Sequence, residues 1–548
     1  MPRDRFVATC TVTVGSAAHT FVGGAIRALD LSVSLYGCEG TIEFLVLDDS
    51  TTGGNYSDEF VSDFASEELS TVSIELRAAH TDSAALDALP KLSTQGVVVE
   101  RSMREWTYRA ELSSPTVLVR AYRLRFVDRA SALWTQHFPL SLYTSKTLKD
   151  LLDAERGTVE LGVDLPSATQ ARVQQFLPLD VESGVSFYDA FFWLMDREGG
   201  QCFYDHTAGS YAVSAQRPAD VAAVEVKAEW VGPVDVRVTV PSRSKRRLVN
   251  VDATIGARRE LAASQAATGV YADSAMRTSI AQDVDDRATL GTSGGSSDPT
   301  TLTITFERYP DVSVMPAQVW TLASAARFAA TSVVVTSDWR VYASRLTLRS
   351  SATTPDHQYG EDSGGFDFDL AVDLEKTTHT AARSPGYRAP VFPVFVEGIV
   401  QSDVGADDEL TYQCAADEAT SIDQYRVKLA VFDGQEVHPF YQPELSSGAV
   451  YIPAFKSEKV LLALEFDRCR IVRHLAWREG ARPPADGQGQ RVYLGKSETN
   501  NTKLTHSYDS ENPVFELKRV HKNDTLFLKL EEGKLTLRVE QVQSESGA

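Results

Sequence analysis

Apolar and polar residues alternate with a period of two along most of this chain. Clear examples are residues 6–14 (FVATCTVTV), 116–127 (TVLVRAYRLRFV), 301–306 (TLTITF) and 425–432 (YRVKLAVF). This period places every second side chain on the same face of a strand, which is typical of a sheet with one buried face. The sequence therefore predicts a mainly β protein.

Residues 144–155 (TSKTLKDLLDAE) have the period of a short helix instead. Leu148, Leu151 and Leu152 are spaced to form one apolar stripe. A hydroxyl at Thr144 or Ser145 is expected to cap the first turn, because an N-cap side chain accepts a hydrogen bond from an unpaired backbone N–H.

A second short helix is predicted within residues 186–200 (SFYDAFFWLMDREGG). Ser186 and Asp189 have the spacing of a capping box at its start. Gly199 and Gly200 can end it, because glycine adopts the left-handed conformation at low cost.

The most regular alternation lies in residues 451–477 (YIPAFKSEKVLLALEFDRCRIVRHLAW), which reverse direction at Asp467 and Arg468. We expect a hairpin whose buried face is made by Val460, Leu462, Leu464 and Phe466 with Cys469, Ile471 and Leu475. Its other face mixes apolar and charged residues. That face is either an ordinary barrel wall or a contact between subunits.

Three polar stretches rich in Gly, Ser, Pro or Asp interrupt these patterns, at residues 281–300, 351–364 and 481–490. Such stretches bury too little apolar surface to offset the cost of ordering the backbone. We expect a flexible loop at about 281–300 and a domain boundary at the last stretch.

The charge of the chain argues against nucleic acid as a partner. Lys and Arg number 54 and Asp and Glu number 75, which gives a formal net charge of −21 at pH 7. Such a chain repels phosphate backbones. The one basic cluster, Ser242–Arg247 (SRSKRR), is too short and isolated to predict a nucleic-acid groove.

Cysteines and hydropathy indicate the compartment. The five cysteines lie far apart, with no CxxC pair, and are expected to be buried thiols in a reducing compartment. The N-terminus has no apolar run typical of a signal peptide, and no stretch of about 20 apolar residues could span a bilayer. We expect the protein to be made in the cytoplasm.

No motif gives positive support for catalysis, a cofactor or a metal. Residues 291–295 (GTSGG) have the letters of a nucleophile elbow without the strand that must precede it, and Gly495-Lys496-Ser497 lacks the phosphate-loop spacing. Asp205 and His206 are expected to form a surface pair at a strand end, and Asp407–Glu409 a solvated loop. We predict no catalytic, cofactor-binding or metal-binding residues and no enzyme activity.

Residues 174–213 (QQFLPLDVESGVSFYDAFFWLMDREGGQCFYDHTAGSYAVS) resemble a segment of the VgrG spike proteins of type VI secretion systems and of related phage-tail hub proteins. The matching residues are Gln175, Glu182, Ser183, Phe187, Leu194, Glu198, Gly199, Phe203, Tyr204 and His206. Residues 122–152 are also similar to the strand, leader segment and helix that precede this segment in the family.

A second resemblance covers the OB-fold spike domain of the same family. Residues 394–435 are similar to its opening strands, and the hairpin at 451–477 to its valine-rich strand. Ser457-Glu458-Lys459 and Asp467-Arg468 stand where the family usually has Gly-Asp-Glu and Gly-Asp-Pro. This departure favours the spike of an extracellular, phage-tail-like contractile particle over VgrG proper.

The resemblance implies three domains: a hub region with β-barrel subdomains and a few short helices at residues 1–390, an OB-fold barrel at 391–482, and a linker with a short trimeric β-prism tip at 483–548. It also implies a structural homotrimer at the front of an inner tube, which transmits the force of contraction. Implied partners are the tube protein, baseplate and hub proteins, a PAAR-type tip cap and an effector cargo, with a membrane only as the target pierced. The particle would assemble in the cytoplasm and act on, or be released toward, another cell.

The last strands suggest how a trimer would form. Leu526, Leu528 and Leu530 alternate before a turn, and Leu535, Leu537 and Val539 alternate after it. Because two strands alone cannot enclose a core, three copies packing these faces about a three-fold axis would stabilise them. The alternative is a hairpin that folds back onto its own barrel.

Three other functions remain open from the sequence. One is VgrG proper, delivering effectors by type VI secretion. The others are a carbohydrate-binding β protein and a cell-wall hydrolase associated with a spike. Only a short polar linker separates barrel and tip, which leaves no room for an inserted hydrolase.

Overall fold

The computed structural model divides the chain into two units. One comprises Met1–Pro139, Leu148–Gln170 and Leu179–Pro390, and the other Leu140–Thr147, Ala171–Pro178 and Val391–Ala548. The structure describes residues 2–541 with the exception of 51–52, 112–115, 241–242, 254, 262–266, 279–280, 282–283, 286, 290–298, 324–327, 381–384, 407–410, 419–420, 442–451, 477–489, 498, 511 and 523.

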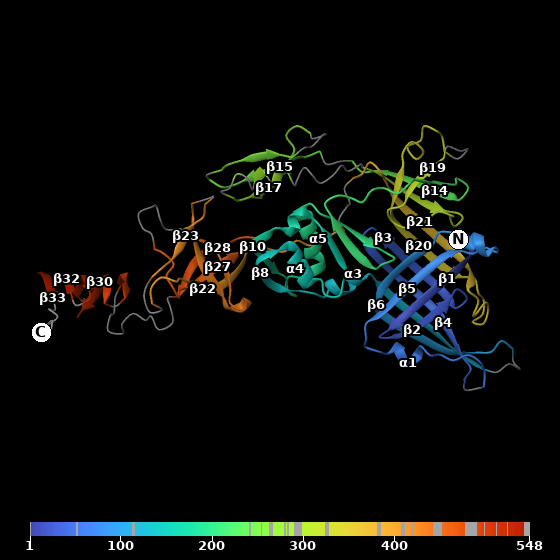
Figure 1. The fold of residues 1–548 in the computed structure, drawn as a ribbon, viewed down its shortest axis with the longest axis horizontal. Helices are drawn as coiled ribbons and strands as arrows, with labels where there is room; N and C mark the ends of the chain where they lie inside the picture. The colour runs from blue at the N-terminus through green and yellow to red at the C-terminus, as the bar shows by residue number, and fades with distance from the viewer. Residues whose placement is uncertain are drawn as a thin grey trace. The chain divides into compact units, whose positions relative to one another are not determined.

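The first unit is built around a closed ring of eight strands, shown mainly in blue and yellow in Figure 1. In ring order these are β1 (Arg3–Val14), β5 (Ser70–Ala78), β6 (Leu92–Tyr108), β7 (Val117–Val127), β4 (Gly37–Asp48), β3 (Ile26–Ser34), β20 (Trp339–Ser350) and β21 (Ser363–Lys376), while β2 (Ala17–Val22) pairs with β1 outside the ring. Alternate residues such as Phe6, Cys10 and Val12 are buried inside. Ring closure removes free sheet edges and confirms the predicted barrel in this region.

Strands β20 and β21 continue into a second, curved sheet. It adds β18 (Thr300–Phe306) and β14 (Val231–Val238) on the β21 side, and β19 (Val319–Leu322) and β13 (Val224–Val226) on the β20 side. Inside it the rings of Phe306 and Trp320 meet edge to face with centroids 5.9 Å apart. Sharing two long strands gives the two β-structures a common wall.

Short helices and a small sheet pack beside the barrel. They are α1 (Val61–Phe64), α2 (Ser83–Ala88), α3 (Arg129–Trp134), α4 (Leu148–Glu155), α5 (Phe187–Glu198), a 3₁₀ turn η2 (Pro166–Thr169), β9 (Leu161–Asp164), β11 (Gln201–Asp205) and β12 (Ser210–Ser214). The predicted α5 is confirmed: Ser186 and Asp189 form the capping box and Gly199 ends the helix at φ 68°. No helix in the described part of the chain is long and apolar enough to cross a membrane.

The predicted cap of the other helix is wrong. Helix α4 begins at Leu148 and buries Leu148, Leu151 and Leu152 as expected. Thr144 and Ser145, however, lie in strand β8 (Leu140–Thr147). Thr144 lies opposite Gln174 because β8 pairs with β10 (Ala171–Pro178), and Ser145 interrupts this register with φ +55°.

A third sheet lies in a segment between β14 and β18. It consists of β16 (Arg258–Glu260), β15 (Lys245–Asn250) and β17 (Tyr271–Met276), with β15 in the middle (green in Figure 1). The predicted loop at 281–300 and the break at 481–490 lie largely outside the described residues.

The second unit contains a closed barrel of five strands, as the OB-fold prediction requires. Its ring order is β22 (Val394–Gln401), β27 (Lys459–Leu464), β28 (Cys469–Ala476), β26 (Phe440–Tyr441) and β24 (Asp423–Leu429), with β23 (Cys414–Ala416), β25 (Gln435–Val437) and a 3₁₀ turn η3 (Ala430–Phe432) attached. The predicted hairpin is β27 and β28, and its buried face includes Val460, Leu462, Leu464 and Phe466.

Two strands from the first third of the chain pack against this barrel and contribute to its core. β8 and β10 pair as an antiparallel ribbon, and Leu142 and Phe176 belong to the core of the barrel. The Phe176 ring lies 5.7 Å from that of Phe432. The sequence analysis placed this ribbon in the hub region of residues 1–390; the structure assigns it to the second unit because its buried side chains pack there.

The ribbon also holds the turn of the β27–β28 hairpin. The Gln174 side-chain amide donates hydrogen bonds to the carbonyls of Glu465, at 3.2 Å, and Arg468, at 2.7 Å. The backbone N–H of Phe176 donates to the carbonyl of Phe466 at 2.7 Å. The Arg468 carbonyl also accepts from the Glu465 N–H at 2.8 Å, so the ribbon adds to the bonds that the turn makes by itself.

Removing the ribbon's anchor should loosen the barrel. Because Phe176 is fully buried, Phe176→Ala should destabilise the second unit by about 3 to 5 kcal/mol. Hydrogen exchange of the β27 and β28 backbone amides measures the loss as faster opening. In the control Val173→Ala, which alters a residue 64% exposed, exchange should stay unchanged; equal acceleration in both variants would contradict the role of Phe176.

The five cysteines are free, and the prediction of buried thiols is confirmed for four of them. Cys10, Cys38, Cys202 and Cys469 are buried, while Cys414 is half-buried. Burial raises the pKa of Cys10 and of Cys38 to about 12 and that of Cys202 and Cys469 further still, because a thiolate is poorly solvated in an apolar interior.

Thiol reactivity should follow this burial. At pH 8 a thiol with a pKa of about 12 is roughly 0.01% thiolate, and only the thiolate attacks a disulfide reagent. Titration of the native protein with dithiobis(nitrobenzoate) should therefore label Cys414 alone, and slowly, whereas denaturation should expose all five. Rapid labelling of a second thiol in the native protein would contradict the assigned burial.

Candidate functional site

The C-terminal segment forms a sheet of its own. Five strands follow one another as an antiparallel meander: β29 (Gln490–Ser497), β30 (Asn500–Asp509), β31 (Asn512–His521), β32 (Asp524–Glu531) and β33 (Lys534–Gln541). Antiparallel partners place their side chains on the same face. The registers therefore show which residues share each face.

One face of this sheet carries an apolar row that runs from edge to edge. Its central row runs Val492, Leu504, Leu517, Leu528 and Leu537 across the five strands. The flanking rows add Leu494, Leu526 and Val539 on one side and Phe515, Leu530 and Leu535 on the other. We call these eleven residues the apolar face.

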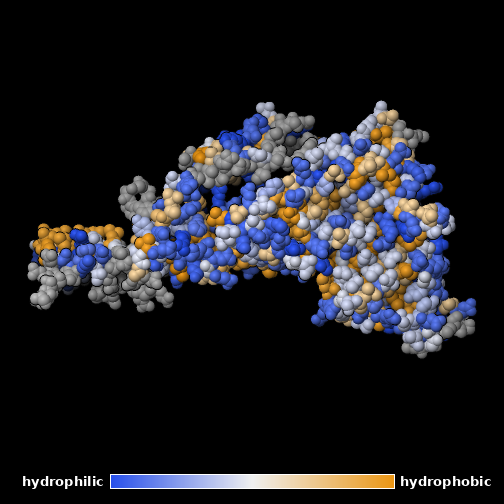
Figure 2. All heavy atoms as spheres, viewed as in Figure 1, coloured by the Kyte–Doolittle hydropathy of each residue, from blue (hydrophilic) through white to orange (hydrophobic). Residues whose placement is uncertain are grey.

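The apolar face is open in the single chain. Leu535, Leu537 and Val539 are 64%, 67% and 69% exposed, and Val492 and Leu494 are more than half exposed. Figure 2 shows hydrophobic residues gathered on this sheet. Full burial of one such side chain is worth about 1.5 to 3 kcal/mol, so the face favours a covering layer.

The opposite face is polar and charged. Lys529 and Lys534 form ion pairs with Glu531 at 2.7 and 3.2 Å, and the hydrogen bond from Lys529 lowers the pKa of Glu531. Arg538 pairs with Glu540 and lies over the Phe527 ring. Such a face is suited to water, so the two faces differ in what they can contact.

The structure brings all six predicted tip residues onto one face. Leu526 is opposite Val539, Leu528 opposite Leu537, and Leu530 opposite Leu535. The prediction of an isolated two-stranded hairpin is wrong, because β29 to β31 extend the pair into a five-stranded sheet.

Sequence reasoning missed β29, β30 and β31 for a physical reason. Thr502, His506 and Arg519 occupy positions on the apolar face, which weakens the period of two in these strands. The signal that could have found them is the nearly regular spacing of the chain reversals after Ser497, Asp509, His521 and Glu531.

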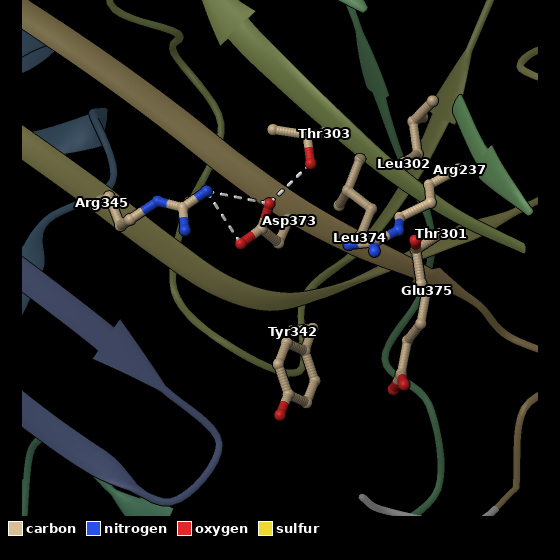
Figure 3. Close-up of a pocket in the computed structure, with 9 residues that line it drawn as sticks. All are labelled: Arg237, Thr301, Leu302, Thr303, Tyr342, Arg345, Asp373, Leu374 and Glu375. Atoms are coloured by element: carbon tan, nitrogen blue, oxygen red, sulfur yellow. Dashed lines mark hydrogen bonds and ion pairs between the residues drawn. The ribbon is translucent and has the colours of Figure 1, made fainter. Parts of the chain in front are cut away.

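A cleft of about 310 Å³ lies on the outer side of β14, β18, β20 and β21 in the first unit (Figure 3). It is lined by Arg237, Thr301, Leu302, Thr303, Tyr342, Arg345, Asp373, Leu374 and Glu375. Asp373 accepts a hydrogen bond from Thr303 at 2.7 Å and an ion pair from Arg345 at 3.1 Å. Glu375 pairs with Arg217 and Arg340. These carboxylates cross-link strands, so the C-terminal sheet remains the stronger candidate site.

The other residues singled out from the sequence are not brought together. The prediction that His206 is on the surface is wrong: it is buried, with Nδ1 3.0 Å from the Thr94 hydroxyl and Nε2 2.9 Å from the Ser34 carbonyl oxygen. Burial lowers the pKa of His206. Residues 291–295 and Asp407–Glu409 lie outside the described residues. Among the described residues, no group of three or more His, Cys, Asp or Glu could hold a metal ion.

Comparison with known proteins gives a likeness of fold. No family model and no curated protein matches the sequence. A chain of the lidless PdpA–VgrG complex matches with a TM-score of 0.69 at 12% identity, over 99% of both chains. In the lidded complex from Francisella the TM-score is 0.70 at 13% identity, over 98% of this chain and 80% of that one. In the half-lidded Francisella complex the TM-score is 0.69 at 13% identity, over 98% of this chain and 88% of that one.

This chain has a VgrG-like hub fold. The resemblance of residues 174–213 is thereby confirmed at the level of fold, and its matching residues have structural roles. Gln175 is fully buried and donates to the Lys146 carbonyl at 3.0 Å. Phe187 and Leu194 lie in the buried side of α5. The VgrG-like segment thus includes strand β10 of the ribbon and the helix α5 that follows it in the sequence.

Gly495 sets the edge of the VgrG-like chain's C-terminal sheet. It has φ +151° at a bulge between β29 and β30, and a Cβ there would lie 2.4 Å from the Cα of Asn501. Gly495-Lys496-Ser497 is therefore a strand bulge in place of a phosphate loop.

Gly495→Ala should detach β29, because the added methyl group meets backbone and the strain costs about 1 to 3 kcal/mol. The measurement is hydrogen exchange of the β29 and β30 amides, which should speed up. Gly533→Asn is the control: Gly533 has φ +66° with nothing within 4 Å of a Cβ, and asparagine tolerates that conformation. Unchanged exchange in Gly495→Ala would show that the close approach is not needed.

Proposed function

We propose that this protein is the structural hub and spike of a contractile injection system. In this proposal it forms a homotrimer at the front of the inner tube and transmits the force of sheath contraction. The observation that carries the proposal is the apolar face, in a chain that has a VgrG-like hub fold. The residues that cover the apolar face must come from outside this sheet, because the sheet's only other face is polar.

In a trimer, the C-terminal sheets of the three chains can cover one another's apolar faces. An antiparallel sheet with one apolar face needs a second layer to enclose a core. Three such sheets around a three-fold axis would turn their apolar faces inward as a prism and leave the ion pairs of Glu531 in water. The outer strand β33 has a large gain, because each of its three apolar residues is 64% or more exposed.

Chain connectivity supports a role under force. The chain passes between the two units at five places: after Pro139, Thr147, Gln170, Pro178 and Pro390. A load carried across five covalent connections is shared, whereas a single linker would bear all of it. Forced unfolding is governed by the unfolding rate, which a ribbon that contributes Leu142 and Phe176 to the barrel core slows.

Further parts of the proposal concern partners and place. The trimer would contact the tube protein and baseplate proteins, receive a separate PAAR-type cap at the short tip, and carry an effector cargo. It would act without enzyme activity of its own, assemble in the cytoplasm, and serve a particle that acts on another cell. The variant OB-fold motif at Ser457-Glu458-Lys459 favours a phage-tail-like particle.

The trimer is tested by charging the centre of the apolar face. Leu537→Arg should convert the full-length protein from trimer to monomer at micromolar concentration, because a cation would be buried against two other copies without a partner. Native mass spectrometry measures the oligomeric state.

Thr536→Arg is the matched control, since Thr536 precedes Leu537 on β33 but belongs to the polar face. It should leave the trimer intact. The wild-type protein could instead be a well-folded monomer in which β32 and β33 are protected from hydrogen exchange. That result would show that the apolar face is covered within one chain, and it would contradict the proposal.

A further inference from the structure

The five-stranded barrel of the second unit is closed by its shortest strand. β26 comprises only Phe440 and Tyr441, and it pairs with β28 on one side and β24 on the other. A strand of two residues makes few backbone hydrogen bonds to its neighbours. The contacts of its side chains therefore contribute much of the free energy that holds it in the ring.

A line of three hydrogen bonds joins this strand to β28 and to the segment before β27. The Tyr441 hydroxyl donates to the carbonyl oxygen of Ile452 at 2.9 Å, and the same hydroxyl oxygen lies 2.9 Å from Nε2 of His474. Nδ1 of His474 lies 2.7 Å from Oε1 of Glu458. We call Ile452, Tyr441, His474 and Glu458 the barrel latch.

The side chains of the barrel latch are held in an ordered framework. Tyr441 and Glu458 are 7% and 9% exposed, and the second carboxylate oxygen of Glu458 accepts from the Phe455 N–H at 2.9 Å. The Tyr441 ring meets the rings of His474 and Tyr425 edge to face, with centroids 5.5 and 5.6 Å apart. Buried polar groups normally have their hydrogen bonds made, so the hydrogens in the barrel latch can be counted.

The three bonds need one more hydrogen than a neutral histidine supplies. The Ile452 carbonyl and the Glu458 carboxylate can only accept, so every hydrogen comes from Tyr441 or His474. The Tyr441 hydroxyl has one hydrogen, and burial raises the pKa of Tyr441, so the hydroxyl keeps that hydrogen near neutral pH. The other two bonds then require a hydrogen on each ring nitrogen of His474, and only the charged imidazolium form has both.

The groups around the His474 ring favour this charged form. The Glu458 carboxylate faces the ring from the segment before β27, and the neutral Tyr441 hydroxyl faces it from β26. On β27 the residue opposite His474 is Val460, while the cationic neighbours in these two strands, Lys459 and Arg473, are exposed. Imidazole is also a stronger base than a carboxylate, so the extra proton resides on His474 and not on Glu458.

We propose that the barrel latch is a proton-dependent switch, in which the imidazolium form of His474 joins β26 and the segment before β27 to β28. When the proton leaves Nε2, the one hydrogen of the Tyr441 hydroxyl faces two acceptors, the ring nitrogen and the Ile452 carbonyl, and one acceptor is left unbonded. The folded barrel thus keeps a proton that the unfolded chain releases above about pH 6.5. The latch therefore adds its full stability below that pH and loses it as the pH rises and the folded barrel releases the proton.

Nitrogen NMR of the histidine side chains measures the protonation state directly. At about pH 7.5 an ordinary histidine is about 10% protonated, so the exposed His357 should show one protonated and one unprotonated ring nitrogen. In the full-length wild type His474 should instead show the imidazolium pattern, with hydrogen on both nitrogens. The variant His474→Gln assigns these signals by their loss. Signals of a neutral His474 ring at this pH would overturn the proposal.

Hydrogen exchange measures the opening of the latch. The protection of the Ser457 and Glu458 amides, corrected for the intrinsic effect of pH on exchange, should fall about fivefold between about pH 6 and about pH 8, because one hydrogen bond is lost. In Tyr441→Phe a neutral ring satisfies the remaining bond to Glu458, so the protection should change by about twofold at most. The control His357→Gln alters an exposed histidine and should keep the fivefold change.

The same pH dependence in the wild type and in Tyr441→Phe would overturn the proposal. If a variant does not fold, the wild type alone decides, because protection that is equal at the two pH values contradicts a latch that loses a bond. The barrel latch lies within one chain, so neither measurement depends on the oligomeric state proposed above.

Discussion

Each sheet of this protein has to cover an apolar face, and the way it does so determines the rest of the structure. In the first unit eight strands close into a ring, so the buried side chains of β1, such as Phe6 and Cys10, meet those of the other ring strands. In the second unit five strands close, and the core is completed by Phe176 of an inserted ribbon. The C-terminal sheet has five strands in a simple meander, and its apolar face is left open in one chain. This difference is the basis on which we propose assembly at the C-terminal sheet.

The inserted ribbon of β8 and β10 affects both the folding of the barrel and the number of chain connections between the two units. Because β8 and β10 come from the first third of the sequence, the barrel's core cannot be completed before both its own strands and the ribbon are present. The same arrangement makes five covalent connections between the units. Gln174 adds specificity, since its amide is bonded to both carbonyls of the hairpin turn. In the proposed role as a spike, these connections would share the load.

Sequence patterns correctly predicted the elements that depend only on interactions between residues close together in the chain. The capping box at Ser186 and the left-handed end at Gly199 are where the sequence places them, because both depend on neighbouring residues. The cap expected at Thr144 fails because pairing with β10, a partner some thirty residues away, takes that segment into a strand. His206 is buried because it packs against Thr94 and Ser34, which no local pattern reveals. The six residues of the candidate site share a face as the alternation of Leu526 to Val539 requires, but the strands beside them carry polar residues that hide the period.

The sequence by itself determined the mainly β class, the two short helices, the barrel hairpin and the apolar stripe of the last two strands, because each follows from a period of two or of 3.6 along neighbouring residues. Only the tertiary structure decided which strands close a ring, that the ribbon of β8 and β10 belongs to the barrel, and that the last pair extends into five strands. The physical reason is that a strand's period shows which side chains share a face, whereas its hydrogen-bonding edges accept any partner that the rest of the chain brings to them.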